Sequence, residues 1–160
     1  MVSIRLAQPE DHSAIVDIWH AGWHDAHASF VPEGILEFRT VECFWSWLEC
    51  STDRFHVAVD NNVVGFVTTK GQELVKLYVA ADARGTGIAS ALLSHGEEQI
   101  SDSGILDAVL FCMAGNTRAQ RFYRREGWTL SNTFADKLWL PVNATGEFVV
   151  DTHRYEKHLN

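Results

Sequence analysis

Hydrophobic positions follow two periods along the chain, and each period predicts one type of element. Val2, Ile4 and Leu6 alternate with polar residues, which is the pattern of a half-buried strand. Pro9 and the two acids after it are typical of a helix start, and hydrophobic residues then recur at helical spacing as far as Trp23. The chain is therefore expected to begin with a strand that leads directly into a helix.

The remaining pattern alternates between strands and helices. A second helix is predicted after Pro32-Glu33-Gly34, and its hydrophobic face would be formed by Ile35, Phe38, Val41, Phe44 or Trp45, and Leu48. Strands are expected over residues 55–59, 63–69, 73–79, 105–113, 128–134 and 147–155, and two further helices over residues 88–101 and 116–126. The run from Ile105 to Met113 is almost entirely apolar, which indicates a strand covered on both faces.

The resulting order is β-α-α-β-β-β-α-β-α-β-β. This order predicts an α/β (α+β) fold with a mixed, mostly antiparallel seven-stranded sheet and helices on both faces. The length of 160 residues is close to the roughly 150 residues typical of one domain, and neither a linker nor a repeat divides the chain. A single domain spanning residues 1–160 is expected.

Composition excludes several classes of protein. Hydrophobic residues make up 46% of the chain, which is too many for a disordered protein. The longest apolar run, Ala108–Ala114, is far shorter than the roughly 20 residues of a membrane span, and the N-terminal residues lack the apolar stretch of an export signal. Cys43, Cys50 and Cys112 form no C-x-x-C motif and are interpreted as reduced thiols, so the expected location is the cytoplasm.

The charge of the chain is negative and unevenly distributed. The net charge of −8 argues against nucleic-acid binding, which needs an excess of Lys and Arg. Residues 1–60 carry ten acids against three arginines, a balance of −7, whereas residues 61–160 carry eleven acids against ten bases, a balance of −1. The two parts of the chain are therefore expected to face differently charged partners.

A glycine-containing loop, Arg84-Gly-Thr-Gly-Ile-Ala89, follows the predicted strand 73–79 and precedes a helix. Such a loop leaves backbone N–H groups unpaired at the positive end of a helix, and together these groups form a phosphate site. An ordinary turn rich in glycine is the alternative. The Walker motif G-x-x-x-x-G-K-[S/T] is absent, and a dinucleotide fold fits poorly because four strands precede the loop.

Two motifs together resemble one enzyme family. The loop Arg84–Ala89 has the form R-x-x-G-x-A, and about thirty residues later Asn116 is followed by Ala119-x-x-Phe122-Tyr123-x-x-x-Gly127-Trp128. With the order of elements, these motifs resemble the GNAT superfamily of N-acetyltransferases over nearly the whole chain. The resemblance implies that acetyl-CoA is the co-substrate and that no metal is needed. Ala81 stands where the family usually has proline, which leaves the loop entry less rigid.

The resemblance also implies which residues hold acetyl-CoA. In the family, two central parallel strands splay apart, and the pantetheine arm pairs with the first of them. Arg84 to Ala89 would bind the pyrophosphate through backbone N–H groups, and Asn116 would contact the cofactor arm. The implied set is Leu77, Tyr78, Val79, Arg84, Gly85, Thr86, Gly87, Ile88, Ala89, Asn116, Ala119 and Tyr123. Five arginines gather around the two motifs, which would compensate the charge of coenzyme A: Arg84, Arg118, Arg121, Arg124 and Arg125.

Acetyl transfer to an amine needs a neutral amine, donors for an oxyanion and a proton for the departing thiolate. Tyr123 is the candidate acid, because the resemblance places it near the thioester sulfur and a phenol is protonated at neutral pH. A purely structural core tyrosine is the alternative. Glu73 is the candidate base, because many family members keep a carboxylate there that takes the amine proton directly or through water. An exposed strand-end glutamate is its alternative. A backbone N–H near Val79 would serve the oxyanion.

The acceptor is less well defined than the cofactor. Glu33, Glu37, Glu42 and Glu49 surround the second helix, which suggests a small cationic acceptor such as a polyamine, an aminoglycoside-like amine or an amino-acid derivative. The alternatives are a protein N-terminus or lysine as acceptor, or a sensor that binds acyl-CoA without turnover. Many relatives are dimers, so a homodimer is one expectation.

Two further groups of side chains lie in the N-terminal helices. His24 and His27 supply only two metal ligands, so a solvated polar face is favoured over a metal site. The aromatic residues of this region are expected to pack mainly in the core, with one or two lining the acceptor pocket: Trp19, Trp23, Phe44, Trp45 and Trp47.

Overall fold

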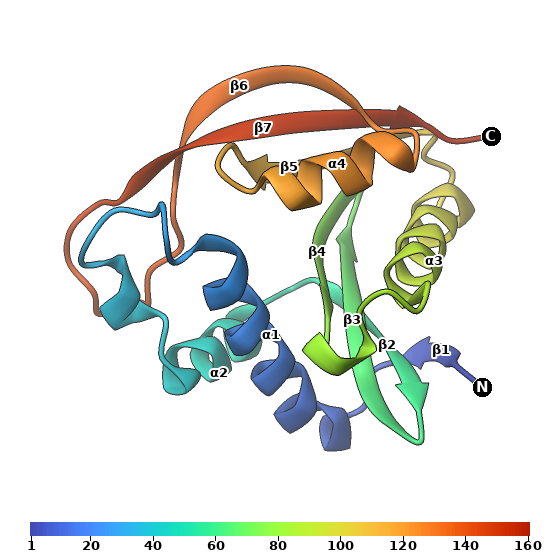
Figure 1. The fold of residues 1–160 in the computed structure, drawn as a ribbon, viewed down its shortest axis with the longest axis horizontal. Coiled ribbons are helices and arrows are strands. Elements are labelled where there is room, and N and C mark those ends of the chain that lie inside the picture. Colours follow the sequence, from blue (N-terminus) through green and yellow to red (C-terminus); the bar gives the residue numbers. More distant parts are fainter.

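A computed structural model describes residues 1–160, and its strands and helices follow the predicted order (Figure 1). The strands are β1 (Ser3–Leu6), β2 (Arg54–Asp60), β3 (Asn62–Lys70), β4 (Glu73–Val79), β5 (Asp107–Met113), β6 (Thr129–Lys137) and β7 (Val149–His158). The α-helices are α1 (His12–His27), α2 (Val41–Cys50), α3 (Ile88–Asp102) and α4 (Thr117–Arg125). Short 3-10 helices are η1 (Pro9–Asp11), η2 (Ile35–Phe38) and η3 (Ala81–Ala83).

All seven strands form one sheet with the order β1-β2-β3-β4-β5-β7-β6. Every neighbouring pair is antiparallel except β4 and β5, so the mixed, mostly antiparallel sheet is confirmed. The parallel pair is joined only at its beginning, where Glu73 lies opposite Val109 and the Val109 N–H donates to the carbonyl of Gln72 (3.0 Å). Beyond this point the two strands separate, and a wedge opens between the two halves of the sheet.

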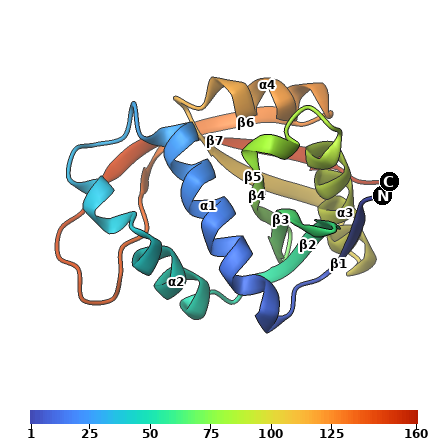
Figure 2. The same cartoon turned by 60° about the horizontal axis from the view of Figure 1, so that its bottom comes forward.

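Helices cover both faces of the sheet and bury two clusters of hydrophobic residues (Figure 2). On one face, α1 and α2 bury Trp19 and Phe44 against Phe66 of β3. On the other face, α3 buries Leu92 and Ile100, and α4 packs beside the same cluster. Each cluster removes large apolar side chains from water, which is the main stabilising contribution to such a fold. No helix of the chain combines the length and the apolar character needed to span a membrane.

The predicted second helix is interrupted. The chain forms η2, turns at Arg39 and Thr40, and only then enters α2. Thr40 is extended (φ −81°, ψ 165°), and its hydroxyl accepts a hydrogen bond from the Cys43 N–H (3.2 Å), so it caps α2. The prediction of one continuous helix from Ile35 was wrong because the capping threonine was read as part of the helix. The break places Arg39 between the two segments.

Two buried histidines make the stability of the fold depend on pH. Burial lowers the pKa of His56 and of His27 to about 4 each, and these residues are 5% and 7% exposed. In the unfolded chain the histidine pKa is near 6.5, so below that pH the unfolded state binds more protons than the folded state. The free energy of unfolding is therefore highest above pH 6.5 and falls as the pH drops toward 4. We expect the free energy of unfolding to fall by about 2 kcal/mol for each histidine between pH 7 and pH 5, at about 1.36 kcal/mol per pKa unit.

Urea unfolding at pH 7 and pH 5 checks this prediction. The difference in free energy of unfolding between pH 7 and pH 5 should be about 2 kcal/mol smaller in His56→Gln, because this variant lacks the histidine with the lowered pKa. The variant His158→Gln is the matched control, since its side chain is 64% exposed, and it should keep the wild-type difference. If the pH dependence of stability is unaltered in His56→Gln, then buried His56 is not one of its causes.

Candidate functional site

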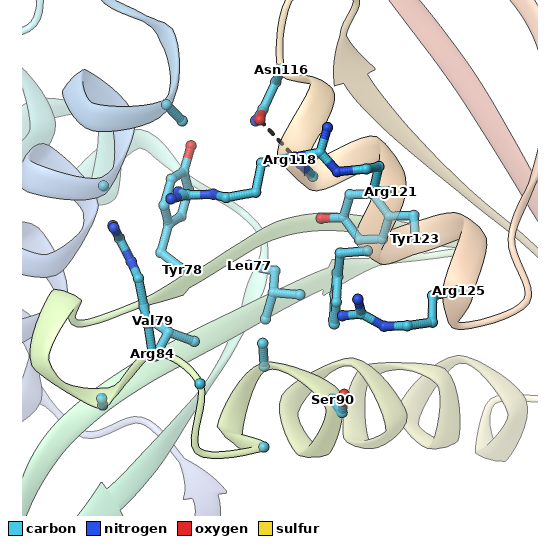
Figure 3. Close-up of a pocket in the computed structure, with 18 residues that line it drawn as sticks. Leu77, Tyr78, Val79, Arg84, Ser90, Asn116, Arg118, Arg121, Tyr123 and Arg125 are labelled. Carbon is cyan, nitrogen blue, oxygen red and sulfur yellow. Dashed lines mark hydrogen bonds between the residues drawn. The ribbon is translucent and has the colours of Figure 1, made fainter.

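The wedge between β4 and β5 contains a cavity with a volume of about 720 Å³. We call this cavity the arginine cleft. Its walls are the end of β4, the loop before α3, the start of α3, and α4 (Figure 3). The lining residues are Gly22, Ala26, Leu77, Tyr78, Val79, Ala83, Arg84, Gly85, Gly87, Ala89, Ser90, Asn116, Arg118, Ala119, Arg121, Phe122, Tyr123 and Arg125.

The end of β4 presents free backbone groups to this cleft. Along its other edge β4 pairs with β3, and Val79 lies opposite Gly65. The Ala80 N–H donates to the carbonyl of Val64 (2.8 Å), and peptide groups in an antiparallel strand alternate between its two edges. The N–H and C=O groups of Leu77 and Val79 therefore face the side from which β5 has departed. An extended ligand chain could pair with them as an additional strand.

The loop before α3 has the geometry of an anion site. Gly85 and Gly87 have positive φ angles of 76° and 85°, a conformation that favours glycine. Gly87 is the N-cap of α3 and provides no side-chain cap, so the first N–H groups of the helix are free to bind an anion. The side chains of Thr86 and Ile88 do not line the cleft: Thr86 donates to the Ala83 carbonyl and Ile88 is buried in the core.

Four arginines concentrate positive charge at the cleft although the chain as a whole is acidic. Arg84, Arg118, Arg121 and Arg125 line it, whereas Arg124 does not. Arg84 and Arg118 form ion pairs with Asp25 of α1, with N–O distances of 2.7 and 3.7 Å. The Arg84 guanidinium holds the pKa of Asp25 below its usual range. The cleft therefore attracts a ligand with several negative charges.

A second cavity, of about 310 Å³, lies on the α1 and α2 side of the wedge. We call it the tryptophan pocket, because Trp19, Trp23, Trp47 and Trp139 line it. Its other lining residues are His27, Arg39, Val75, Lys76, Leu77, Tyr78, Phe111, Cys112, Met113, Asn116, Ala119, Tyr123, Asp136, Lys137, Leu138 and Thr152. The sequence pattern gave no signal for Trp139, which lies after β6 and stacks on Trp47 with ring centroids 4.6 Å apart.

The two cavities meet at two tyrosines. Tyr78 and Tyr123 line both cavities, together with Leu77, Asn116 and Ala119. Neither hydroxyl forms a hydrogen bond with the other residues drawn in Figure 3. Burial raises the pKa of both phenols, and the nearby Cys112 adds to this effect. Both hydroxyls therefore keep their protons at neutral pH, at the point where the two cavities meet.

Asn116 and His27 form a connected pair beside the tyrosines. Asn116 caps α4 by accepting from the Ala119 N–H (3.2 Å), and its amide nitrogen lies 3.4 Å from His27 Nε2. His27 Nδ1 lies 3.0 Å from the carbonyl of Trp23, so Nδ1 carries the proton and Nε2 accepts from Asn116. The expectation that His27 is on a solvated face was wrong, because it is buried and orients Asn116.

Two further residues singled out from the sequence, His24 and Glu73, lie outside both cavities. His24 Nε2 contacts the carbonyl of Arg39 (2.6 Å), and no group of three or more His, Cys, Asp or Glu side chains could hold a metal ion. Glu73 is half-buried at the closed end of the wedge and lines neither cavity. Burial and the nearby Asp53 raise the pKa of its carboxyl group.

In comparison with known proteins, the chain is similar to acetyltransferases. A sequence model of the acetyltransferase (GNAT) family matches residues 14–128. The chain is 30% identical to a mycothiol acetyltransferase of Mycolicibacterium gilvum, covering 78% of this chain and 44% of that protein, so it spans less than half of that relative. It is 34% identical to an uncharacterized N-acetyltransferase of Mycobacterium bovis, covering 69% and 72% of the two chains.

A solved structure shows the same fold. The PaiA N-acetyltransferase of Thermoplasma acidophilum, determined in complex with coenzyme A, superposes with a TM-score of 0.68 at 19% identity. The superposition covers 99% of both chains.

Proposed function

The chain belongs to the GNAT family of acetyltransferases, and from this we propose that it transfers the acetyl group of acetyl-CoA directly to a primary amine. The observation that carries this proposal is the junction of the two cavities at Tyr78 and Tyr123. One cavity suits a long polyanion and the other a small molecule, so the two substrates would meet in a ternary complex. The small volume of the tryptophan pocket favours a small acceptor.

The residues of the arginine cleft fit acetyl-CoA. The free N–H groups at Gly87 and the start of α3 would bind the pyrophosphate, and the four arginines would neutralise its charges. The free edge of β4 at Leu77 and Val79 would pair with the amide groups of the pantetheine arm. Asn116, held by His27, would direct its amide toward the same arm.

Tyr123 would supply the proton that the departing thiolate needs. Its raised pKa keeps the hydroxyl protonated, and its position at the junction brings that proton close to both substrates. The Val79 N–H, which faces the cleft, would stabilise the negative charge that develops on the carbonyl oxygen when the amine attacks. The carbon–nitrogen bond forms, the carbon–sulfur bond breaks, and the sulfur leaves with the proton from Tyr123.

Glu73 would take the proton that the attacking amine loses. Because Glu73 lines neither cavity, the proton would reach it through water rather than directly. Its raised pKa, caused by burial and by Asp53, makes it a stronger base than an exposed glutamate.

Two-substrate kinetics test the proposed mechanism. Direct transfer predicts double-reciprocal lines that intersect when acetyl-CoA and amine are varied together, and it predicts no acetyl-enzyme by mass spectrometry after incubation with acetyl-CoA alone. Parallel lines with a covalent acetyl-enzyme would contradict direct transfer. Binding of acetyl-CoA without thiol release in the presence of any amine would instead indicate a sensor.

The glycine at the start of α3 offers a test of the cofactor site. We expect Gly87→Val to lower the affinity for acetyl-CoA at least tenfold, because valine does not tolerate a φ of 85° and its side chain would project where the pyrophosphate must approach. Isothermal titration calorimetry measures the affinity.

Gly71→Val is the matched control for this prediction. Gly71 also has a positive φ, 58°, and no atom lies within 4 Å of the position that a Cβ would occupy there. It lies in the turn between β3 and β4, away from the cleft. This variant should bind acetyl-CoA like the wild type. Unchanged affinity for acetyl-CoA in a folded Gly87→Val protein would show that this loop does not bind the pyrophosphate.

A further inference from the structure

One charged side chain in the tryptophan pocket has unusual surroundings. Arg39 is only 1% exposed, yet it lies outside every ion pair of the molecule. Its Nη1 donates to the carbonyl of Phe38 (2.9 Å), whereas Nε and Nη2 are buried without a hydrogen-bond partner. Burial lowers the pKa of Arg39 to about 10, so the guanidinium remains charged at neutral pH.

The surrounding rings stabilise this charge but leave its donors unused. The guanidinium carbon lies 5.0 Å from the ring centroid of Trp23, 5.1 Å from that of Trp47 and 5.9 Å from that of Trp139. Cation–π contacts are favourable at such distances. Aromatic faces do not accept the in-plane N–H bonds of Nε and Nη2 well, and a buried charged donor without an acceptor is costly.

The other cations of the pocket are already neutralised. Lys76 forms a buried ion pair with Asp53 (2.6 Å), and the more exposed Lys137 pairs with Glu147 (3.3 Å). Asp136 is the one carboxylate that lines the pocket, and it forms no ion pair with Arg39. The glutamates that suggested a cationic acceptor, Glu33, Glu37, Glu42 and Glu49, do not line the pocket at all. The pocket therefore contains one cation with no anion opposite it.

We propose that Arg39 binds a carboxylate of the acceptor, so that the acceptor is a small amine that also carries a carboxylate, as an amino acid does. The free Nε and Nη2 atoms lie on the same side of the guanidinium, and this pair matches the two oxygens of a carboxylate. The tryptophan rings would contact the apolar part of the same molecule. This inference rests on the proposed acetyl transfer and specifies its acceptor.

The test compares acceptors that differ in one group. Aromatic and aliphatic amino acids are assayed against their primary amides, which keep the amine and the side chain but lack the negative charge. Thiol release from acetyl-CoA gives kcat/KM for each acceptor. We expect the best acid to exceed its amide by about 10²-fold, as for a charge-assisted bidentate contact. In Arg39→Met this preference should disappear, mainly through a higher KM for the acid.

A second variant and a control separate recognition from folding. Arg39→Lys keeps the charge but not the paired donors, and it should retain only part of the preference. Arg54→Met removes an exposed arginine outside both cavities and should leave the preference unchanged. Because Arg39 has no ion pair to lose, Arg39→Met should melt close to the wild-type temperature. A large drop in melting temperature with an unchanged ratio of acid to amide would make Arg39 structural and overturn the proposal.

Binding can also be followed without turnover. N-acetylated amino acids, the expected products, should quench tryptophan fluorescence in the wild type and bind at least tenfold more weakly to Arg39→Met. If amides or polyamines are acetylated as well as the amino acids, the carboxylate site is wrong while acetyl transfer stands. If no amine is acetylated but the N-acetylated acids still bind through Arg39, the carboxylate site stands while the proposed transfer fails.

Discussion

Replacing Tyr123 with phenylalanine should reduce kcat about 10²- to 10⁴-fold and leave acetyl-CoA binding almost unchanged. This range is what general acid catalysis typically contributes, and it corresponds to roughly 2.7–5.5 kcal/mol of activation free energy. Phenylalanine keeps the ring at the junction of the two cavities and removes only the proton donor. Loss of one structural hydrogen bond would instead lower stability by about 0.5–1.5 kcal/mol. Single-turnover rates under conditions where chemistry is limiting measure the effect.

Two other tyrosines serve as comparisons for this experiment. Tyr155 is fully buried and donates to Gln120 (3.2 Å), so Tyr155→Phe should lower stability without a comparable loss of kcat. Tyr78 presents the second hydroxyl at the junction, so Tyr78→Phe shows whether the loss belongs to Tyr123 alone. A Tyr123→Phe enzyme with nearly wild-type kcat would mean that water or the amine supplies the proton.

The substitution Asp53→Asn should destabilise the protein by about 3–5 kcal/mol, the usual consequence of removing one partner of a buried ion pair. The side chains of Lys76 and Asp53 are 9% and 8% exposed, and Thr68 donates to the same carboxylate oxygen (3.0 Å). The substitution leaves the Lys76 ammonium buried between the rings of Trp19 and Trp47. Calorimetry should show a melting temperature roughly 6–20 °C lower, at about 2–4 °C per kcal/mol.

A double variant isolates the unpaired charge as the cause. Lys76→Met combined with Asp53→Asn removes the buried charge and replaces it with an apolar side chain that can pack on the same tryptophans. This double variant should regain most of the lost stability. If it is as unstable as Asp53→Asn alone, the effect comes from the lost Thr68 contact or from packing.

Local patterns in the sequence were sufficient for much of the fold and for many of the residues that line the arginine cleft. The loop around Gly87 and the helix with Tyr123 are short segments in which spacing, glycine conformation and helix starts are local properties. The position of the interrupted helix depended on a competing local signal, the Thr40 cap, which a hydrophobic pattern does not include.

The tryptophan pocket depends on contacts between distant segments. The sequence therefore indicated only that one or two aromatic residues of the N-terminal helices line such a pocket, and Trp19, Trp23 and Trp47 line it. Trp139 stacks on Trp47 from a loop 92 residues later in the chain, and Arg39 lies against both rings. His27 reaches Asn116 only because α1 and the start of α4 meet beside the wedge. Arg39, His27 and Trp139 belong to no motif, and the charge balance of the N-terminal region described its surface rather than the lining of the pocket.

Whether the protein transfers acetyl groups to amines is tested by measuring thiol release from acetyl-CoA across a panel of amines, with mass spectrometry of the acceptor. Direct acetyl transfer predicts amine-dependent release of free coenzyme A, with one acetyl group added to the acceptor nitrogen for each thiol formed. Tight binding of acetyl-CoA with no amine-dependent thiol release from any small amine or peptide would contradict it, and would show a protein that binds the cofactor without using it.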